Sequence, residues 1–127
     1  MFLGLRTIIY PAPGLDASKA WFTRLLGIEP YFEERSYVGF QVAGYELALD
    51  PNSPLDAGPV TYWGVRDCDD GLAWLVGAGA VVREPVRDVG DSIRVATVIE
   101  PAGNVIGIIE NPHFELPGGP MPAGPGR

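Results

Sequence analysis

The chain has 127 residues, of which 46% are apolar, and its formal net charge is −7. These values predict one globular domain, because a chain of this size buries a core and is too apolar to stay disordered. Its positive charges are scattered, so we expect no nucleic-acid partner and no membrane surface as partner. The single cysteine excludes an internal disulfide, and no apolar run approaches the ~20 residues that span a bilayer, so a cytoplasmic location is expected.

The first half of the chain is predicted to hold one strand, one helix and three further strands. β-branched and aromatic residues favour a strand at 5–10. Segment 16–27 has apolar residues at helical spacing, with Asp16 as the expected N-cap and Gly27 as the glycine that ends the helix. Three prolines indicate a linker at 51–59. The remaining strands are expected at 31–35, 37–43 and 45–50.

The second half repeats this order. A strand is expected at 60–66 and a helix at 67–79, which Asp67 or Asp69 would cap. The three strands that follow are expected at 81–86, 92–100 and 104–110.

The two halves also agree in register. Gly27 and Gly79, which end the two helices, are 52 residues apart, whereas Gly44 and Gly103, which open the last turn of each half, are 59 apart. The second half therefore holds about seven extra residues, which we place near 87–91. This agreement favours two βαβββ modules over a generic α+β sandwich whose halves are similar by coincidence.

Three segments, 16–30, 65–86 and 94–110, resemble the vicinal oxygen chelate superfamily, which includes glyoxalase I, the bleomycin-resistance proteins and the extradiol dioxygenases. The last is similar to the family's Asp-Pro-Asp-Gly-Asn turn and final strand, with Glu100 and Ala102 in place of the two aspartates. The resemblance covers about residues 5–112. It implies an α+β fold, in which two βαβββ modules form an incomplete barrel around a cavity, with the helices on the outer face. We expect modules at about 5–50 and 60–110 within a single domain at 1–116, followed by a flexible Gly/Pro-rich tail at 117–127.

The resemblance also locates the positions that hold a metal in metal-dependent members, on the first and last strands of each module. These positions carry Thr7, Ala48, Val60 and Gly107, none of which is His, Asp or Glu. A divalent ion needs several converging N or O donors, so no metal and no cofactor is expected. Glyoxalase or dioxygenase activity that depends on a metal is therefore not expected. If the fourth strand is shifted, Glu46 faces the cavity and adds only one carboxylate.

Three hypotheses of function remain. The first is a metal-independent binder of an apolar or aromatic compound, similar to the bleomycin-resistance proteins. The second is a metal-free enzyme of lyase or isomerase type that uses Glu46 as acid or base, with Arg94 or Tyr62 fixing the substrate. The third is an assembly subunit without a ligand, and in each case we expect a homodimer. The candidate ligand-binding residues are Thr7, Ile9, Phe40, Tyr45, Glu46, Ala48, Tyr62, Arg94 and Gly107.

Several of these residues have an equally simple structural interpretation. Glu46 would be solvated at the mouth of the barrel, and Arg94 would be a surface arginine on a strand. Cys68 is expected to be a packed small residue, and His113 an exposed loop residue. All three tryptophans are expected in the core, with Trp63 facing the helices and Tyr62 facing the cavity.

Overall fold

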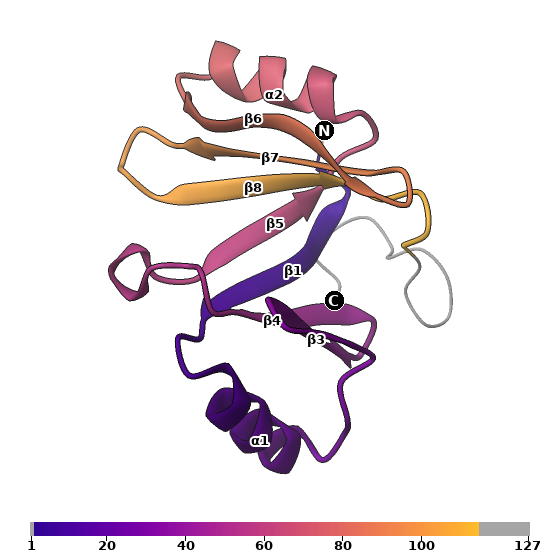
Figure 1. The fold of residues 1–127 in the computed structure, drawn as a ribbon. Helices are drawn as coiled ribbons and strands as arrows, with labels where there is room; N and C mark the ends of the chain where they lie inside the picture. Colours follow the sequence, from indigo (N-terminus) through magenta and orange to yellow (C-terminus); the bar gives the residue numbers. More distant parts are fainter. Residues whose placement is uncertain (1, 115–127) are drawn as a thin grey trace, which may run out of the picture.

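The computed structural model describes residues 2–114, so the predicted tail at 117–127 lies outside the described residues. Eight strands form one sheet in the order β2-β3-β4-β1-β5-β8-β7-β6, and the sheet curls without closing (Figure 1). The elements are β1 (Gly4–Pro11), α1 (Leu15–Leu26), β2 (Phe32–Glu34), β3 (Tyr37–Val42), β4 (Tyr45–Asp50), the 3-10 helix η1 (Leu55–Ala57), β5 (Val60–Gly64), α2 (Cys68–Gly77), β6 (Val81–Gly90), β7 (Ile93–Ile99) and β8 (Val105–Glu110).

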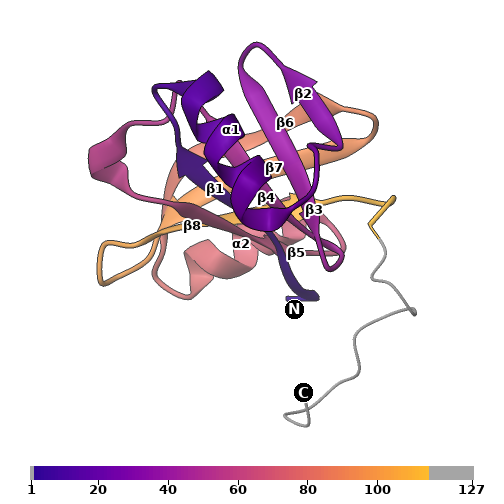
Figure 2. The ribbon, with the colours of Figure 1, turned by 90° about the horizontal axis from the view of Figure 1, so that it is seen from below.

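The predicted fold is confirmed. Each half is a strand, a helix and three strands, and the first strand of each half pairs in parallel with its last, β1 with β4 and β5 with β8. The two halves join through the antiparallel pair of β1 and β5. Helix α1 packs against β4, and α2 packs against β6, β7 and β8. Both helices therefore cover the outer face of the sheet, at opposite ends of the molecule in Figure 1 and with α1 nearest the viewer in Figure 2.

The helix ends follow the expected signals with one exception. Gly27 follows α1 in a left-handed conformation with φ 71°, as predicted. The N-cap of α1 is Gly14 rather than Asp16, which lies in the first turn, so that prediction is wrong by two residues. At α2 the side chain of Asp67 accepts a hydrogen bond from the backbone N–H of Asp70 at 2.9 Å, as an N-cap does.

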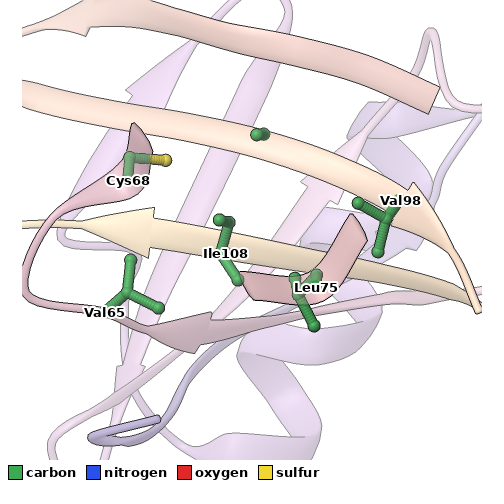
Figure 3. Close-up of a cluster of buried hydrophobic side chains, with 6 residues drawn as sticks. Val65, Cys68, Leu75, Val98 and Ile108 are labelled. Atoms are coloured by element: carbon green, nitrogen blue, oxygen red, sulfur yellow. The ribbon is translucent and has the colours of Figure 1, made fainter. Parts of the chain in front are cut away.

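Two apolar clusters lie between the helices and the sheet. The one under α2 includes Cys68, Leu75 and Ile108 (Figure 3), and the one under α1 includes Phe40 and Leu49. Since side chains alternate along a strand, the residues between these positions face the concave side of the sheet. The side chains in these two clusters face the helices, so only the alternate side chains of each strand can line a site on the concave side.

The predicted positions of the three tryptophans are confirmed only for Trp63. Trp63 stacks on Phe2 with ring centroids 4.9 Å apart, on the outer side of the sheet as expected. Trp21 and Trp74 are 51% and 39% exposed, so the prediction that they lie in the core is wrong for both. Each lies on a helix that packs one side on the sheet, and the other side of such a helix is exposed to solvent.

The extra residues of the second half lie in β6. That strand has 10 residues where its counterpart β2 has 3, which accounts for the expected excess. Its ladder with β7 is interrupted by register shifts, and the hairpin turn that follows holds Asp91 and Ser92 at φ 59° and 63°. None of the helices formed by residues 2–114 has the length and apolar character required to cross a membrane.

Candidate ligand-binding cleft

The concave face of the sheet encloses a cleft of about 850 Å³, a volume typical of small-molecule sites. Both modules contribute to its walls. Its apolar lining residues are Ile9, Phe32, Val60, Val89, Ile93, Val95, Ile109 and Phe114, and its tyrosines are Tyr31, Tyr37, Tyr45 and Tyr62.

Glu46 lies in this cleft at the centre of a group of hydroxyls. Its Oε1 accepts hydrogen bonds from Thr7 Oγ1 at 3.0 Å and from the Tyr37 hydroxyl at 2.8 Å. Its Oε2 accepts one from the Tyr31 hydroxyl at 2.6 Å. The parallel ladder places Thr7 directly opposite Glu46, which explains why the first of these contacts forms.

The open question about the fourth strand is thereby answered. Glu46 faces the cleft, and Ala48 faces the same side because it is two residues further along β4. Ala48 is fully buried, opposite Ile9 on one neighbouring strand and Gly39 on the other. Glu46 is therefore one of the polar groups that β4 contributes to the cleft, together with Tyr45 and Asp50.

Gly39 makes room for this carboxylate. It lies on β3, diagonal to Glu46, and a Cβ atom at this position would lie 2.6 Å from Glu46 Oε2 and 3.0 Å from Tyr31 Cε1. Any larger residue would force the carboxylate or the ring to move. The glycine thus brings Glu46 and Tyr31 together above the strand.

The tyrosines around Glu46 stay protonated near neutral pH. Burial raises the pKa of Tyr37 and of Tyr31 well above the ordinary value, and the neighbouring Glu46 carboxylate raises both further. Each hydroxyl can therefore donate to the carboxylate. A carboxylate has about four acceptor positions, and three are used here, so about one is left for a donor group of a ligand.

In the second module, the ring of Tyr62 occupies the space beside Gly107. Tyr62 pairs with Gly107 across β5 and β8, and a Cβ at position 107 would lie 2.5 Å from Tyr62 Cδ2. The Tyr62 ring thus covers the backbone of the final strand. Burial and, after it, the charge of Glu84 raise the pKa of the Tyr62 hydroxyl.

The donor set in the cleft does not fit the metal site of metal-dependent members of the superfamily. Of the four corresponding positions only Thr7 has a donor atom, and the place beside Gly107 is taken by an aromatic ring. Among residues 2–114, no three His, Cys, Asp or Glu side chains come together as metal ligands do. Thr7 and Glu46 provide fewer donors than a transition metal requires.

Two of the predicted site residues lie elsewhere, and the expectation that they line the cavity is wrong. Phe40 is fully buried in the cluster under α1, because Val38, Phe40 and Val42 take the helix-facing side of β3. Arg94 lies on the outer side of β7, where its guanidinium binds Asp69 at 2.8 Å and Glu110 at 3.4 Å.

The remaining predicted residues lie on the concave side. Thr7, Ile9, Tyr45, Glu46 and Tyr62 line the cleft. Ala48 and Gly107 face it but are covered by their neighbours.

Sequence analysis missed the residues that complete the site. Tyr31 and Tyr37 flank β2 and reach Glu46 from 15 and 9 residues away. Arg83 and Arg87 enter the cleft from β6. Two tyrosines around a short strand are no signal by themselves, and only the pairing of β3 with β4 brings them to the carboxylate.

No protein-family model matches the sequence, and no curated protein matches it at a significant level. Several solved structures, however, are similar to this chain. A variant of the Streptomyces coelicolor methylmalonyl-CoA epimerase in complex with 2-nitronate-propionyl-CoA is 17% identical with a TM-score of 0.73, over 92% of this chain and 100% of that one. A glyoxalase/bleomycin resistance protein/dioxygenase superfamily member from Vibrio splendidus 12B01 is 20% identical with a TM-score of 0.65, over 83% and 97%. The Mycobacterium tuberculosis methylmalonyl-CoA epimerase is 20% identical with a TM-score of 0.66, over 85% and 87%.

These similarities identify the fold. The chain has the vicinal oxygen chelate fold, as the sequence motifs implied. At this level of identity the likeness does not extend to activity, since one fold hosts many functions.

Proposed function

We propose that this protein binds a small organic molecule in the cleft without a metal, with an apolar or aromatic body and a hydrogen-bond donor directed at Glu46. The observation that carries this proposal is a carboxylate held by three hydroxyls inside a cleft with apolar walls. Three contacts fix its orientation, and about one acceptor position is left for a donor group of a ligand.

The walls support an apolar or aromatic body for the ligand. Ile9, Val60, Val95 and Ile109 line the middle of the cleft, on β1, β5, β7 and β8. Burying their exposed surface stabilises a complex by about 25 cal/mol for each Å² removed from water. Tyr62 lines the cleft as well, although its ring also covers Gly107.

A metal-free enzyme of lyase or isomerase type is the second candidate. The Tyr37 hydroxyl and the Glu46 carboxylate form a donor–acceptor pair inside the cleft, which a proton-transfer step requires. Two of the similar structures are epimerases, and epimerisation removes and returns a proton at one carbon. We rank this candidate second because the three hydroxyls already occupy most of the carboxylate's acceptor positions.

A thermal-shift screen of amines, alcohols and aromatic compounds tests the proposal. A ligand at 100 times its Kd stabilises the folded state by about 2.7 kcal/mol, which raises the midpoint by several degrees. We expect Glu46→Gln to abolish the shift that a hit gives with the wild type. Glu29→Gln is the matched control, because Glu29 is exposed and lies outside the cleft.

Two results would change this ranking. Hits that stabilise the Glu46→Gln variant as well as the wild type would contradict the role given to Glu46. Exchange of a carbon-bound hydrogen of the hit for deuterium in D₂O, lost in Glu46→Gln but not in Glu29→Gln, would favour the enzyme over the binder.

We also propose a homodimer, which is the assembly part of the third hypothesis. Leu5 and Trp74 are exposed on the outer side of the sheet, where Phe2 contacts both Trp63 and Trp74. Leu5 lies opposite Trp63 in the β1–β5 ladder, which places it next to this aromatic group. A dimer would cover it. Light scattering at micromolar concentration tests this, and a monomer mass would contradict it.

A further inference from the structure

The strand β6 brings a second group of charges into the cleft, on the side that the second module contributes. Arg83, Glu84 and Arg87 all line the cleft, although simple alternation would send Glu84 to the other face. The ladder with β7 shifts register on both sides of Glu84. A bulge turns an additional residue to the same face, which explains how all three enter the cleft.

Arg83 and Glu84 are fixed to the wall by a buried hydroxyl. Arg83 Nη1 donates to Thr97 Oγ1 at 3.4 Å, and the Thr97 hydroxyl donates to Glu84 Oε1 at 3.2 Å. Thr97 is 1% exposed, so this contact is anchored in the sheet. The guanidinium and the carboxylate also approach each other to 3.5 Å, which balances their charges.

Arg87 has no such partner. Within residues 2–114 its guanidinium takes part in no hydrogen bond and no ion pair. Its charge acts on the Tyr62 hydroxyl, and together with Arg83 it opposes the rise in the pKa of that hydroxyl. Arg87 and Tyr62 both line the cleft. A guanidinium has five N–H donors and binds a planar carboxylate through two of them.

The geometry points to a bifunctional ligand, with a cationic or other donor group bound by Glu46 and a carboxylate bound by Arg87. This inference rests on the proposed function and specifies its ligand class as an amphoteric organic acid. Glu46 and Arg87 are supplied by different modules and face the same cleft only because the sheet curls. Apolar residues of the central strands and the ring of Tyr62 lie in the cleft as well, which suits an apolar body joining two polar ends.

A series of ω-aminoalkyl benzoic acids of increasing chain length provides the probe. Each acid is compared with its methyl ester, which lacks the carboxylate, and with its N-acetyl derivative, which lacks the ammonium group. Binding is measured by isothermal titration calorimetry to the full chain and to Arg87→Gln and Glu46→Gln. Arg66→Gln serves as control, because Arg66 is exposed and lies outside the cleft. Arg87 is exposed on an edge strand, so we expect Arg87→Gln to fold as the wild type does, and its thermal unfolding midpoint checks this.

We expect one chain length to bind the wild type at least about tenfold more tightly as the acid than as the ester. Arg87→Gln should remove this preference, and Arg66→Gln should keep it. Equal affinity of acid and ester for the wild type, or an equal loss of both in Arg87→Gln, would overturn the inference and leave the proposed function standing. A preference for the free amine over the N-acetyl form that Glu46→Gln does not change would contradict the proposed function instead. If no member of the series binds the wild type, the inference is overturned, and the thermal-shift screen decides the proposed function separately.

Discussion

The contact between Tyr62 and Gly107 gives a prediction about stability that can be worked out from the structure. A Cβ atom at position 107 would lie 2.5 Å from Cδ2 and 2.6 Å from Cε2 of the ring. Tyr62 is 9% exposed and packs with Val60 and Val95, so its ring has little room to move away. An alanine at position 107 must therefore displace the ring or separate the strands.

The two opposing effects have different sizes. Overpacking of a core costs ~1–3 kcal/mol, whereas alanine in a strand gains ~0.5–1 kcal/mol over glycine through backbone entropy. We expect Gly107→Ala to lower the free energy of unfolding by about 1–2 kcal/mol in urea titrations. Gly77→Ala is the control, because a Cβ at this last residue of α2 would meet no atom within 4 Å. It should leave stability unchanged or raise it by up to ~1 kcal/mol.

A double-mutant cycle attributes the cost to the ring. Tyr62→Ala should by itself lower stability by ~3–5 kcal/mol, as large-to-small aromatic substitutions in cores do. With the ring absent, the added methyl at position 107 should lose its overpacking cost and keep the ~0.5–1 kcal/mol gain in backbone entropy. The double variant should therefore exceed the additive expectation by ~1–3 kcal/mol, the cost of overpacking. Additivity within ~0.5 kcal/mol, or a Gly107→Ala variant as stable as the wild type, would refute the reasoning.

Four further predictions follow from the site and the core. Gly39→Ala should displace the Glu46 carboxylate, whose flexible end can move away from the added methyl, and should abolish ligand binding. It should lower the free energy of unfolding by only ~1 kcal/mol in urea titrations, and unchanged binding would contradict this. Folding raises the pKa of Tyr37 above its ordinary value of 10.0, so its contribution to the free energy of unfolding should be fully present below that pH and decrease above it. Urea midpoints from about pH 8 to 11 should therefore fall less steeply for Tyr37→Phe than for the wild type, and equal slopes would count against this. Burial raises the pKa of the Cys68 thiol to about 11, so iodoacetamide at about pH 8 should label it only as fast as the chain unfolds, and rapid labelling of the native protein would be inconsistent with this burial. Elemental analysis of protein purified without a tag or chelator should find Zn, Ni, Mn and Fe well below stoichiometric amounts, and a stoichiometric metal lost in Glu46→Gln would overturn the metal-free assignment.

Local signals in the sequence were sufficient for the order of elements and for several of their ends. Gly27 ends α1 because only a residue tolerant of positive φ suits that position, and Asp67 begins α2 because its side chain accepts from the first turn. The spacing of glycines also located the longer β6 before its length was known. These features depend on residues close together in the chain, so a sequence carries them directly.

The sequence also determined which donor atoms are missing. Thr7, Ala48, Val60 and Gly107 have their side chains whatever the fold, and three of them have no side-chain donor at all. What it did not show is that the ring of Tyr62 lies over Gly107, because that contact depends on the pairing of β5 with β8.

Only the tertiary structure decided which side of each strand faces the cleft. Alternation divides β3 into two faces, but both carry side chains suited to a pocket, and Phe40 fell on the side that α1 covers. Alternation also places Arg94 on the outer face of β7, whereas the bulges of β6 bring Glu84 to the same face as Arg83 and Arg87. Tyr31 and Tyr37 meet Glu46 only through the register of β3 against β4. Register and curvature arise from contacts between distant segments, and for that reason the cleft could be assembled only from the folded chain.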